Sequence, residues 1–298
     1  MGLTDSFRVP LLAAMAGLAA TGAACVDIVA TGGAGYIERE EKRFPVAGRP
    51  QITLSTFDGA IEVRTWEQPE VLVEIEKRAL DKDLIGDIEV RTEQDGSQIT
   101  VEVRMKSGSS AWGLHRSARL KVSLPASSDL TAKTGDGAID VERVSGRIDL
   151  RSGDGAIRGQ ELSGDVTART GDGSIRLDRI DGRLDLDTGD GSIVAAGTFT
   201  RLRVRSGDGS VRIHVERGST ALEDWDVVTG DGPVTIDLPE RFDAELDAHT
   251  GDGHVSVSGR ILSQTTESTR RAIRGRLGEG GHSLNLRSGD GSIRVGRS

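Results

Sequence analysis

The sequence has little cysteine and few aromatic residues: one Cys, three Trp, one Tyr and five Phe in 298 residues. The single cysteine, Cys25, excludes an intrachain disulfide. So few rings argue against a bulky globular core, whereas 40 glycines indicate many tight turns and thin β-layers packed with Ile, Val and Leu. The chain is long enough to bury a substantial core in one large domain or two ordinary ones.

Basic residues are also in the minority. Lys and Arg number 38 against 47 Asp and Glu, which gives a formal net charge of −9. Binding to a phosphate backbone needs a basic stripe, so we do not expect nucleic acid as a partner. The excess negative charge favours solubility instead.

The N-terminus has the pattern of an export signal. Arg8 precedes an apolar stretch from Val9 to Ala24 that ends in small residues and is too short for a transmembrane helix. Gly22-Ala-Ala-Cys25 resembles a lipobox, with Gly22 where leucine is usual. Acylation of Cys25 and ordinary cleavage near Ala24 remain alternatives. We expect a signal peptide over 1–25, a linker over 26–43, and a mature protein in the periplasm, the outer membrane or at the cell surface.

The segment 44–125 alternates apolar and polar residues in several short runs. Such runs predict strands, and Asp95-Gly96 between two of them predicts a hairpin turn. We therefore expect a strand-rich N-terminal region before the repeats. The clearest runs are Ile61–Val63, Val71–Ile75, Ile88–Val90 and Ile99–Val103.

From Thr134 onward the tripeptide Gly-Asp-Gly recurs, and Phe57-Asp58-Gly59 is an earlier relative. The first five copies follow one another at intervals of 18 residues, and each copy is preceded by Ser or Thr and followed two residues later by Ile or Val. Fixed-period repetition of this kind indicates stacked structural units. The aspartates of these repeat turns are Asp136, Asp154, Asp172, Asp190, Asp208, Asp231, Asp252 and Asp290.

Each 18-residue unit divides into two similar halves, each with one short strand and one turn. Coils of this kind, stacked at about 4.8 Å, would bury their Ile, Val and Leu positions between two sheets about 10 Å apart. We therefore predict an all-β, right-handed parallel β-solenoid over 126–298. The inward column would contain Ile139, Ile157, Ile175, Ile193 and Val211. Two outward columns would alternate in charge, Arg147, Asp165, Arg183 and Arg169, Asp187, Arg205.

Insertions interrupt the repeat after Asp208 and after Asp252, where successive aspartates are 23, 21 and 38 residues apart. The largest insertion, 263–282, carries four arginines. A solvated loop is the favoured interpretation, and an interaction surface is the alternative. The arginines are Arg270, Arg271, Arg274 and Arg276.

A column of stacked aspartates suggests calcium, as in nonapeptide β-rolls. Those rolls carry glycine-rich turns on both sides of the coil, whereas the alternate turns here read like Val144-Ser-Gly146. Asp between glycines also suits a tight turn, because Asp can bond the nearby backbone and Gly supplies positive φ. We expect no metal and no cofactor. His249 and His254 flank Asp252, and an exposed pair beside a turn is favoured over a metal site.

Catalytic motifs are weak. Lys133-Thr134-Gly135 matches one motif of penicillin-recognising enzymes, but no Ser-x-x-Lys or Gly-x-Ser-x-Gly accompanies it. A non-catalytic surface scaffold or adhesin is therefore the favoured function, with an unknown protein or envelope component as partner. An envelope-stress or regulatory binding module and a β-helical polysaccharide-acting enzyme are the alternatives.

Three phrases resemble a known bacterial family, the DUF4097 β-strand repeat proteins, which carry the name "putative adhesin". Leu124-Pro125 leads to Thr134-Gly-Asp-Gly, Leu238-Pro239 leads to Thr250-Gly-Asp-Gly, and Gly278-Glu-Gly-Gly precedes the last repeat. The resemblance covers the chain from about Phe44 to its end. It implies an extracytoplasmic β-solenoid with adhesion or envelope-stress roles, and it implies no catalytic residues.

Overall fold

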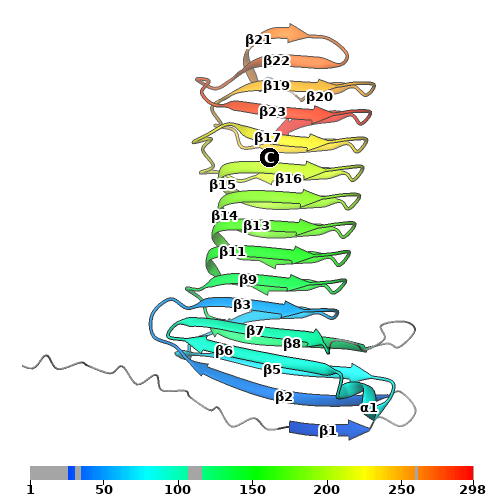
Figure 1. Ribbon diagram of the computed structural model, residues 1–298. Helices are drawn as coiled ribbons and strands as arrows, with labels where there is room; N and C mark the ends of the chain where they lie inside the picture. Colours follow the sequence, from blue (N-terminus) through cyan, green and yellow to red (C-terminus); the bar gives the residue numbers. More distant parts are fainter. Residues whose placement is uncertain (1–25, 31–34, 107–115, 259–260, 298) are drawn as a thin grey trace, which may run out of the picture.

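Strands that end at Gly-Asp-Gly turns stack into an elongated pile of coils (Figure 1). The computed structural model describes residues 26–30, 35–106, 116–258 and 261–297. The predicted signal segment with Cys25 lies outside the described residues. In the described part of the chain, no helix is long and apolar enough to cross a membrane.

The middle of the molecule is regular. Ile139 pairs in register with Ile157, Ile157 with Ile175, and Ile175 with Ile193, always in parallel and always 18 residues apart. This confirms a β-solenoid with two short strands per 18-residue coil. The first stack of strands contains β9 (Asp129–Thr134), β11 (Ser145–Ser152), β13 (Ser163–Thr170) and the second halves of β14 (Ile175–Thr188) and β15 (Ile193–Ser206). The second stack contains β10 (Ile139–Glu142), β12 (Ile157–Gln160) and the first halves of β14 and β15.

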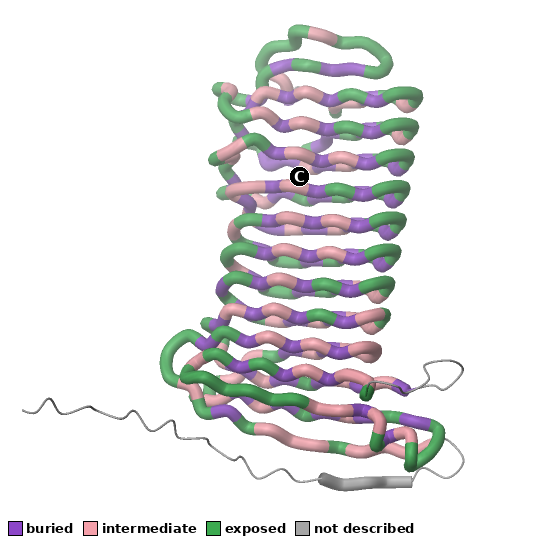
Figure 2. The backbone as a smooth tube through the Cα atoms, in the orientation of Figure 1, coloured by how far each residue is buried: buried purple, intermediate pink, exposed green. Residues whose placement is uncertain are grey.

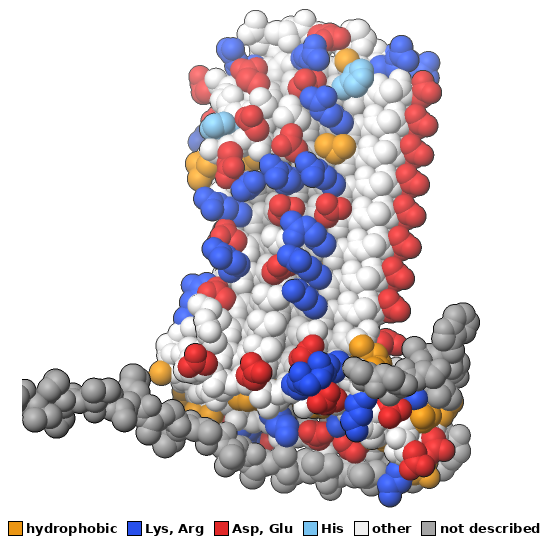
Figure 3. All heavy atoms as spheres, in the orientation of Figure 1, with side chains coloured by type: hydrophobic (Ala, Val, Ile, Leu, Met, Phe, Trp, Pro, Cys, Tyr) orange, Lys and Arg blue, Asp and Glu red, His pale blue; other side chains and the backbone are white. Residues whose placement is uncertain are grey.

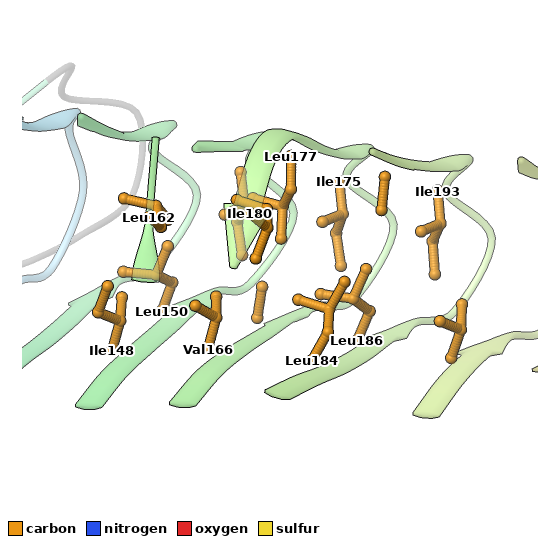
Figure 4. Packing of buried hydrophobic residues seen from close by; sticks show 14 of the residues in the cluster. Ile148, Leu150, Leu162, Val166, Ile175, Leu177, Ile180, Leu184, Leu186 and Ile193 are labelled. Atoms are coloured by element: carbon orange, nitrogen blue, oxygen red, sulfur yellow. The ribbon is translucent and has the colours of Figure 1, made fainter. Parts of the chain in front are cut away.

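The core lies between the two stacks. Burial alternates along every coil (Figure 2), and the predicted inward column from Ile139 to Val211 is at most 1% exposed. In Figure 4, Leu184 and Leu186 of one stack point toward Ile175 and Leu177 of the other. Each such side chain contributes about 1.5–3 kcal/mol when fully buried, so the stack is held by a single long hydrophobic core.

At the N-terminal end, the coils do not follow sequence order. The coil β3–β4 lies between the later coil β7–β8 and the first regular coil, because β3 pairs with both β7 and β9 while β4 pairs with both β8 and β10. The chain returns from one to the other through β5, the short helix α1 and β6. The bounds are β3 (Gln51–Thr56), β4 (Ile61–Trp66), β5 (Glu70–Ala79), α1 (Lys82–Ile85), β6 (Ile88–Asp95), β7 (Gln98–Met105) and β8 (Arg116–Pro125).

Antiparallel strands close this end. β6 and β7 form the predicted hairpin at Asp95-Gly96, where Gly96 has a φ of 57°. On the other stack, β5 pairs with β8, β2 (Tyr36–Pro45) with β5, and β1 (Val26–Ala30) with β2. The linker predicted over 26–43 is therefore wrong, because β1 and most of β2 occupy it. The sequence pattern does not predict β2, because charged residues occupy positions that are normally apolar in a strand.

The C-terminal end repeats the departure from sequence order. β23 lies between β17 and β19, and β24 lies between β18 and β20, so the last coil of the chain is inside the stack (Figure 1). The bounds are β16 (Val211–Val215), β17 (Trp225–Thr229), β18 (Val234–Leu238), β19 (Ala244–Thr250), β20 (Val255–Val257), β23 (Ser283–Ser288) and β24 (Ile293–Arg297).

The segment 263–282 is not the solvated loop that the sequence predicts. It supplies most of β21 (Leu262–Ser268) and all of β22 (Ala272–Leu277), an antiparallel pair that covers the outer edge of β19. Ala272, Ile273 and Leu277 are buried, which caps the core. β21 has polar exposed residues and two register shifts, features that discourage pairing with a further strand.

Candidate functional site

The repeat turns meet along one edge of the solenoid. Figure 3 shows acidic side chains in a continuous column there. The aspartates follow the order of the coils in the stack, so Asp58 comes first and Asp290 lies before Asp252. All eight predicted aspartates are exposed. That these turn aspartates hold no metal stays a prediction.

A buried hydroxyl closes each turn and ties it to the neighbouring coil. Thr170 Oγ1 donates to the carbonyl of Gly155 in the preceding coil at 3.0 Å, and Ser152 Oγ both donates to the Gly137 carbonyl and accepts from the Gly155 N–H, each at 2.9 Å. Such a bond contributes about 1 kcal/mol net. The same donation is made by Thr134, Thr188, Ser206, Thr229, Thr250 and Ser288.

The glycines of the turn are required by close stacking. A Cβ on Gly155 would overlap the carbonyl oxygen of Gly137, and a Cβ on Gly173 would overlap that of Gly155. The sequence predicts that these glycines supply positive φ. That prediction is wrong, because no glycine of the described Gly-Asp-Gly turns has a positive φ. Only Gly59 in the early relative has it, at 125°. Glycine is therefore required because neighbouring turns stack too closely to leave room for a Cβ atom.

Like charges along the edge repel one another. Two carboxylates one coil apart, about 4.8 Å, repel by roughly 1 kcal/mol in water. At the half-buried end of the column, burial and the charge of Asp136 raise the pKa of Asp58, and a hydrogen bond from the Gly59 backbone only partly offsets them. The edge is thus a line of negative potential.

Within the described ranges, no three His, Cys, Asp or Glu side chains are grouped closely enough to hold a metal ion. His249 and His254 are exposed, and Asp252 between them lies 3.8 Å from Arg271. The predicted exposed pair beside a turn matches these positions.

The outward columns of alternating charge are present as predicted. Arg147 is in register with Asp165, and Asp165 with Arg183, whose side chains lie 3.8 Å apart. Arg169, Asp187 and Arg205 form the second column. Exposed pairs contribute little to stability, so these columns chiefly set the charge pattern of the broad face.

Two of the four arginines in the basic patch predicted over 263–282 form ion pairs with the strand that the segment covers. Arg274 lies 3.2 Å from Asp247 and 2.9 Å from Glu267, and Arg276 lies 2.8 Å from Glu245. These hydrogen-bonded carboxylates raise the pKa of both guanidinium groups. The arginines therefore attach the cap to β19.

A charged cluster at the N-terminal end was missed from the sequence. Lys77 Nζ bonds Glu38 at 2.7 Å and also bonds Glu40, which lies 3.4 Å from Lys42. Burial alone would raise the pKa of Glu40, but the hydrogen bond and charge of Lys77 outweigh it and lower that pKa. The sequence does contain a signal for this cluster. Lys77 continues the inward positions Val71, Val73 and Ile75, and a charge at such a position indicates a buried ion pair.

An aromatic cluster fills the core where the repeat loosens. Trp225 packs against Phe199 at 6.4 Å and Phe242 at 5.0 Å between ring centroids. Its indole N–H is buried with no hydrogen-bond partner among the described residues. Trp66 is remote and donates to the Glu70 carbonyl, and Trp112 lies outside the described residues. The tryptophans form no common platform.

Two solved structures of low sequence identity are similar to this chain over most of their length. One titled "putative adhesin", from Bacteroides fragilis, is 11% identical, covers 86% of this chain and 96% of its own, and has a TM-score of 0.42. A "putative lipid binding protein" from Parabacteroides distasonis is 15% identical with the same coverages and a TM-score of 0.38. Such scores carry no functional assignment. No curated protein matches the chain.

The family resemblance is confirmed over nearly the whole described solenoid. The family model Toastrack DUF4097 matches residues 51–296, from the first residue of β3 to the last but one of β24. The match therefore includes the out-of-order coils at both ends as well as the regular middle. The chain belongs to the Toastrack DUF4097 family.

Proposed function

We propose that this protein is a non-catalytic, exported envelope protein that acts as a surface scaffold or adhesin for a protein or another surface component. The observation that carries the proposal is the in-register stacking of coils through the regular middle of the molecule. It turns each outward position into a straight column with one side chain about every 4.8 Å, so the molecule presents long periodic faces.

Rigidity supports this role. Each turn is fixed by a buried hydroxyl that bonds the next coil, and the inward columns form one continuous core. A surface held in this way loses little conformational freedom on binding, which favours recognition by an extended face. Family membership supports the solenoid architecture, and adhesion is part of the proposal.

Export rests on the N-terminal sequence. The first described strand, β1, begins at Val26, directly after the predicted processing point, so cleavage before Cys25 would remove no described strand. A lipid on Cys25 would place the anchor beside β1 at the N-terminal end of the stack. The remaining coils would then project away from that end (Figure 1).

Cell fractionation with the full-length chain tests export. We expect the protein in the envelope fraction, with a mature N-terminus at or near Cys25 by intact mass. A chain lacking residues 1–25 should stay in the cytoplasm. Retention of Met1 on the envelope-bound protein would contradict both the cleaved and the acylated form.

Surface binding and catalysis need separate measurements. Cells that display the protein should adhere to immobilised matrix proteins or polysaccharides more than cells without it, and charge reversal along one outward column should reduce adhesion while the melting temperature is unchanged. Incubation of purified protein with the same polysaccharides should release no products. Cleavage products would support the β-helical enzyme instead.

A further inference from the structure

A mostly basic column of side chains runs beside the acidic edge, on the broad face formed by β9, β11, β13 and the strands stacked with them. Each of its residues stands three positions before a turn aspartate, and Figure 3 shows basic side chains in a line on this face. From the N-terminal end of the stack, the basic column consists of Lys133, Arg151, Arg169, Asp187, Arg205, Val228, Arg287 and His249.

Many charges of this column and of the acidic edge are uncompensated. Lys133, Arg205 and Arg287 are exposed and form no ion pair with the described residues, while the other two arginines reach aspartates of the next outward column at 2.8 Å and 3.7 Å. Of the eight edge aspartates, Asp252 alone has an ion-pair partner in the described part of the chain, Arg271 at 3.8 Å. Cations and anions therefore face solvent side by side without pairing to each other.

Only glycine separates the two columns at the surface. Between Arg169 and Asp172, Thr170 is buried and Gly171 carries no side chain. A Cβ on Gly171 would overlap the carbonyl oxygen of Gly153 in the preceding coil, so this strip stays bare. A second surface can thus approach the basic column and the acidic edge together.

A partner that carries both signs of charge fits this strip better than a polyanion does. The next outward column lies two residues, or about 7 Å, from the basic column. That distance is within the screening length of about 8 Å at physiological ionic strength, so a polyanion would be repelled from both sides. A second copy of this chain instead brings both charges at the same interval of about 4.8 Å. The acidic residues of the next column are Asp149, Asp185, Asp226 and Asp247.

We propose that two copies of this chain associate side by side and in the same direction, with the edge aspartates of each copy on the basic column of the other. A two-fold axis above the glycine strip and parallel to the stack places each coil opposite the same coil of the second copy, so every contact occurs twice. Five coils then oppose a cation to an aspartate, as with Arg169 and Asp172 of the second copy, and one coil opposes Asp187 to Asp190. The inference depends neither on export nor on adhesion to another component.

Association should be weak and sensitive to salt. The contact is a narrow strip about 29 Å long between Lys133 and Arg287, and small interfaces are typical of transient complexes. The screening length falls from about 8 Å at 0.15 M salt to about 3 Å at 1 M. Sedimentation velocity of the full chain, up to about 1 mM protein, should show dimers at the lower salt and monomers at the higher. A wild type that stays monomeric at both, whether or not it binds a soluble acidic polysaccharide, would overturn the proposal.

Asp187→Arg should strengthen the dimer, because it replaces the one repulsive coil with a sixth attractive one. We expect the dissociation constant to fall by about tenfold. Asp165→Arg is the matched control, since it makes the same change of charge on the same face but in the outward column farthest from the acidic edge. An equal effect of both substitutions, or no effect of Asp187→Arg, would contradict the proposed contact.

Charge reversal with rescue tests which residues face each other. Arg205→Glu with Arg287→Glu should abolish dimers, and so should Asp208→Arg with Asp290→Arg. A mixture of these two double variants should form heterodimers, because each reversed charge then meets an opposite one. A mixture that stays monomeric while both variants melt like the wild type would contradict the proposal.

The control for the first reversal is Arg183→Glu with Arg201→Glu, a pair in register at the other end of the strands. This variant has the same net charge and should still form dimers with itself. It should form none with the Asp208→Arg, Asp290→Arg chain. Heterodimers in that control mixture would show that net charge, and not the strip, drives association.

Cross-linking tests the direction of the two copies. In chains with Cys25→Ala, one copy carries Arg151→Cys and the other Asp154→Cys, and a short thiol-specific cross-linker should join them. Arg151→Cys mixed with Asp290→Cys should give little product, because these positions lie five coils apart in the stack. More product from the second mixture than from the first would rule out the parallel dimer.

Discussion

At the scale of single residues, each coil is attached to the next through a hydroxyl and two glycines rather than through the aspartate between them. The hydroxyl is buried and satisfies groups on two coils, whereas the aspartate is exposed. Stability and surface chemistry are thus carried by neighbouring but different residues. We therefore expect that the exposed aspartates can be changed without disturbing the turn.

Thr170→Val tests the hydroxyl. The substitution preserves shape but leaves the Gly155 carbonyl without its donor, and an unsatisfied buried acceptor costs about 1–3 kcal/mol. We expect this loss in the free energy of unfolding by urea denaturation. Thr167→Val, on the outward face of the same strand, should change it by less than about 0.5 kcal/mol. Equal losses in both variants would show that the hydroxyl bond is unimportant.

Asp58→Asn tests the repulsion along the edge. Burial and Asp136 raise the folded-state pKa of Asp58 above its unfolded value, so stability is lost as the pH rises through the folded pKa. The amide removes this loss. We expect a higher melting temperature than wild type at pH 7 and no difference well below the ordinary aspartate pKa of about 3.9. A lower melting temperature at pH 7 would contradict this.

At the scale of elements, the two ends of the stack are closed by antiparallel strands of opposite character. β22 adds buried apolar residues beneath a polar, irregular β21. β2 instead turns charged residues inward and pairs them with Lys77. The N-terminal end is therefore closed by ion pairs and the C-terminal end by a small hydrophobic cap.

Lys77→Met tests the charged closure. The change leaves Glu38 without the cation of its ion pair and Glu40 with Lys42 alone, and breaking a buried ion pair costs about 3 kcal/mol or more. Wild-type stabilisation should be present above the unfolded pKa of Glu40 and lost as the pH falls through its lowered folded pKa. Urea denaturation at several pH values measures both effects. The triple change with Glu38→Gln and Glu40→Gln should recover much of the stability at pH 7; no recovery would mean that Lys77 acts through packing.

The elements also show where sequence reasoning succeeds. The 18-residue period correctly predicted the length of the coil, the inward column and the charge columns. It could do so because residues 18 positions apart lie next to one another on neighbouring coils. β2 and β22 could not be predicted in this way, since each pairs antiparallel with both of its neighbours and belongs to no repeat. The pairing of Arg274 and Arg276 could not be predicted because their partners, Asp247 and Glu245, lie on a strand that only the fold brings alongside.

At the scale of the whole molecule, a nearest-neighbour stack should tolerate the loss of one complete coil. Deleting Gly153 to Thr170 places Ile139 on Ile175 with every column in register. Deleting nine residues, Gly153 to Glu161, exchanges the two stacks for all later coils. Deleting ten also turns inward residues outward. We expect melting temperatures to fall in the order intact, minus eighteen, minus nine, minus ten. An eighteen-residue deletion no more stable than the ten-residue one would contradict the stacked-coil register.

The placement of an out-of-order coil at each end has an evolutionary consequence. A duplicated coil added outside either end of the described stack would meet an antiparallel closure and not a free parallel edge. Lengthening is therefore confined to the interior, where insertion of 18 codons restores every column at once. The strict period between Asp136 and Asp208, and its loss on either side, is the record that such growth would leave in the sequence.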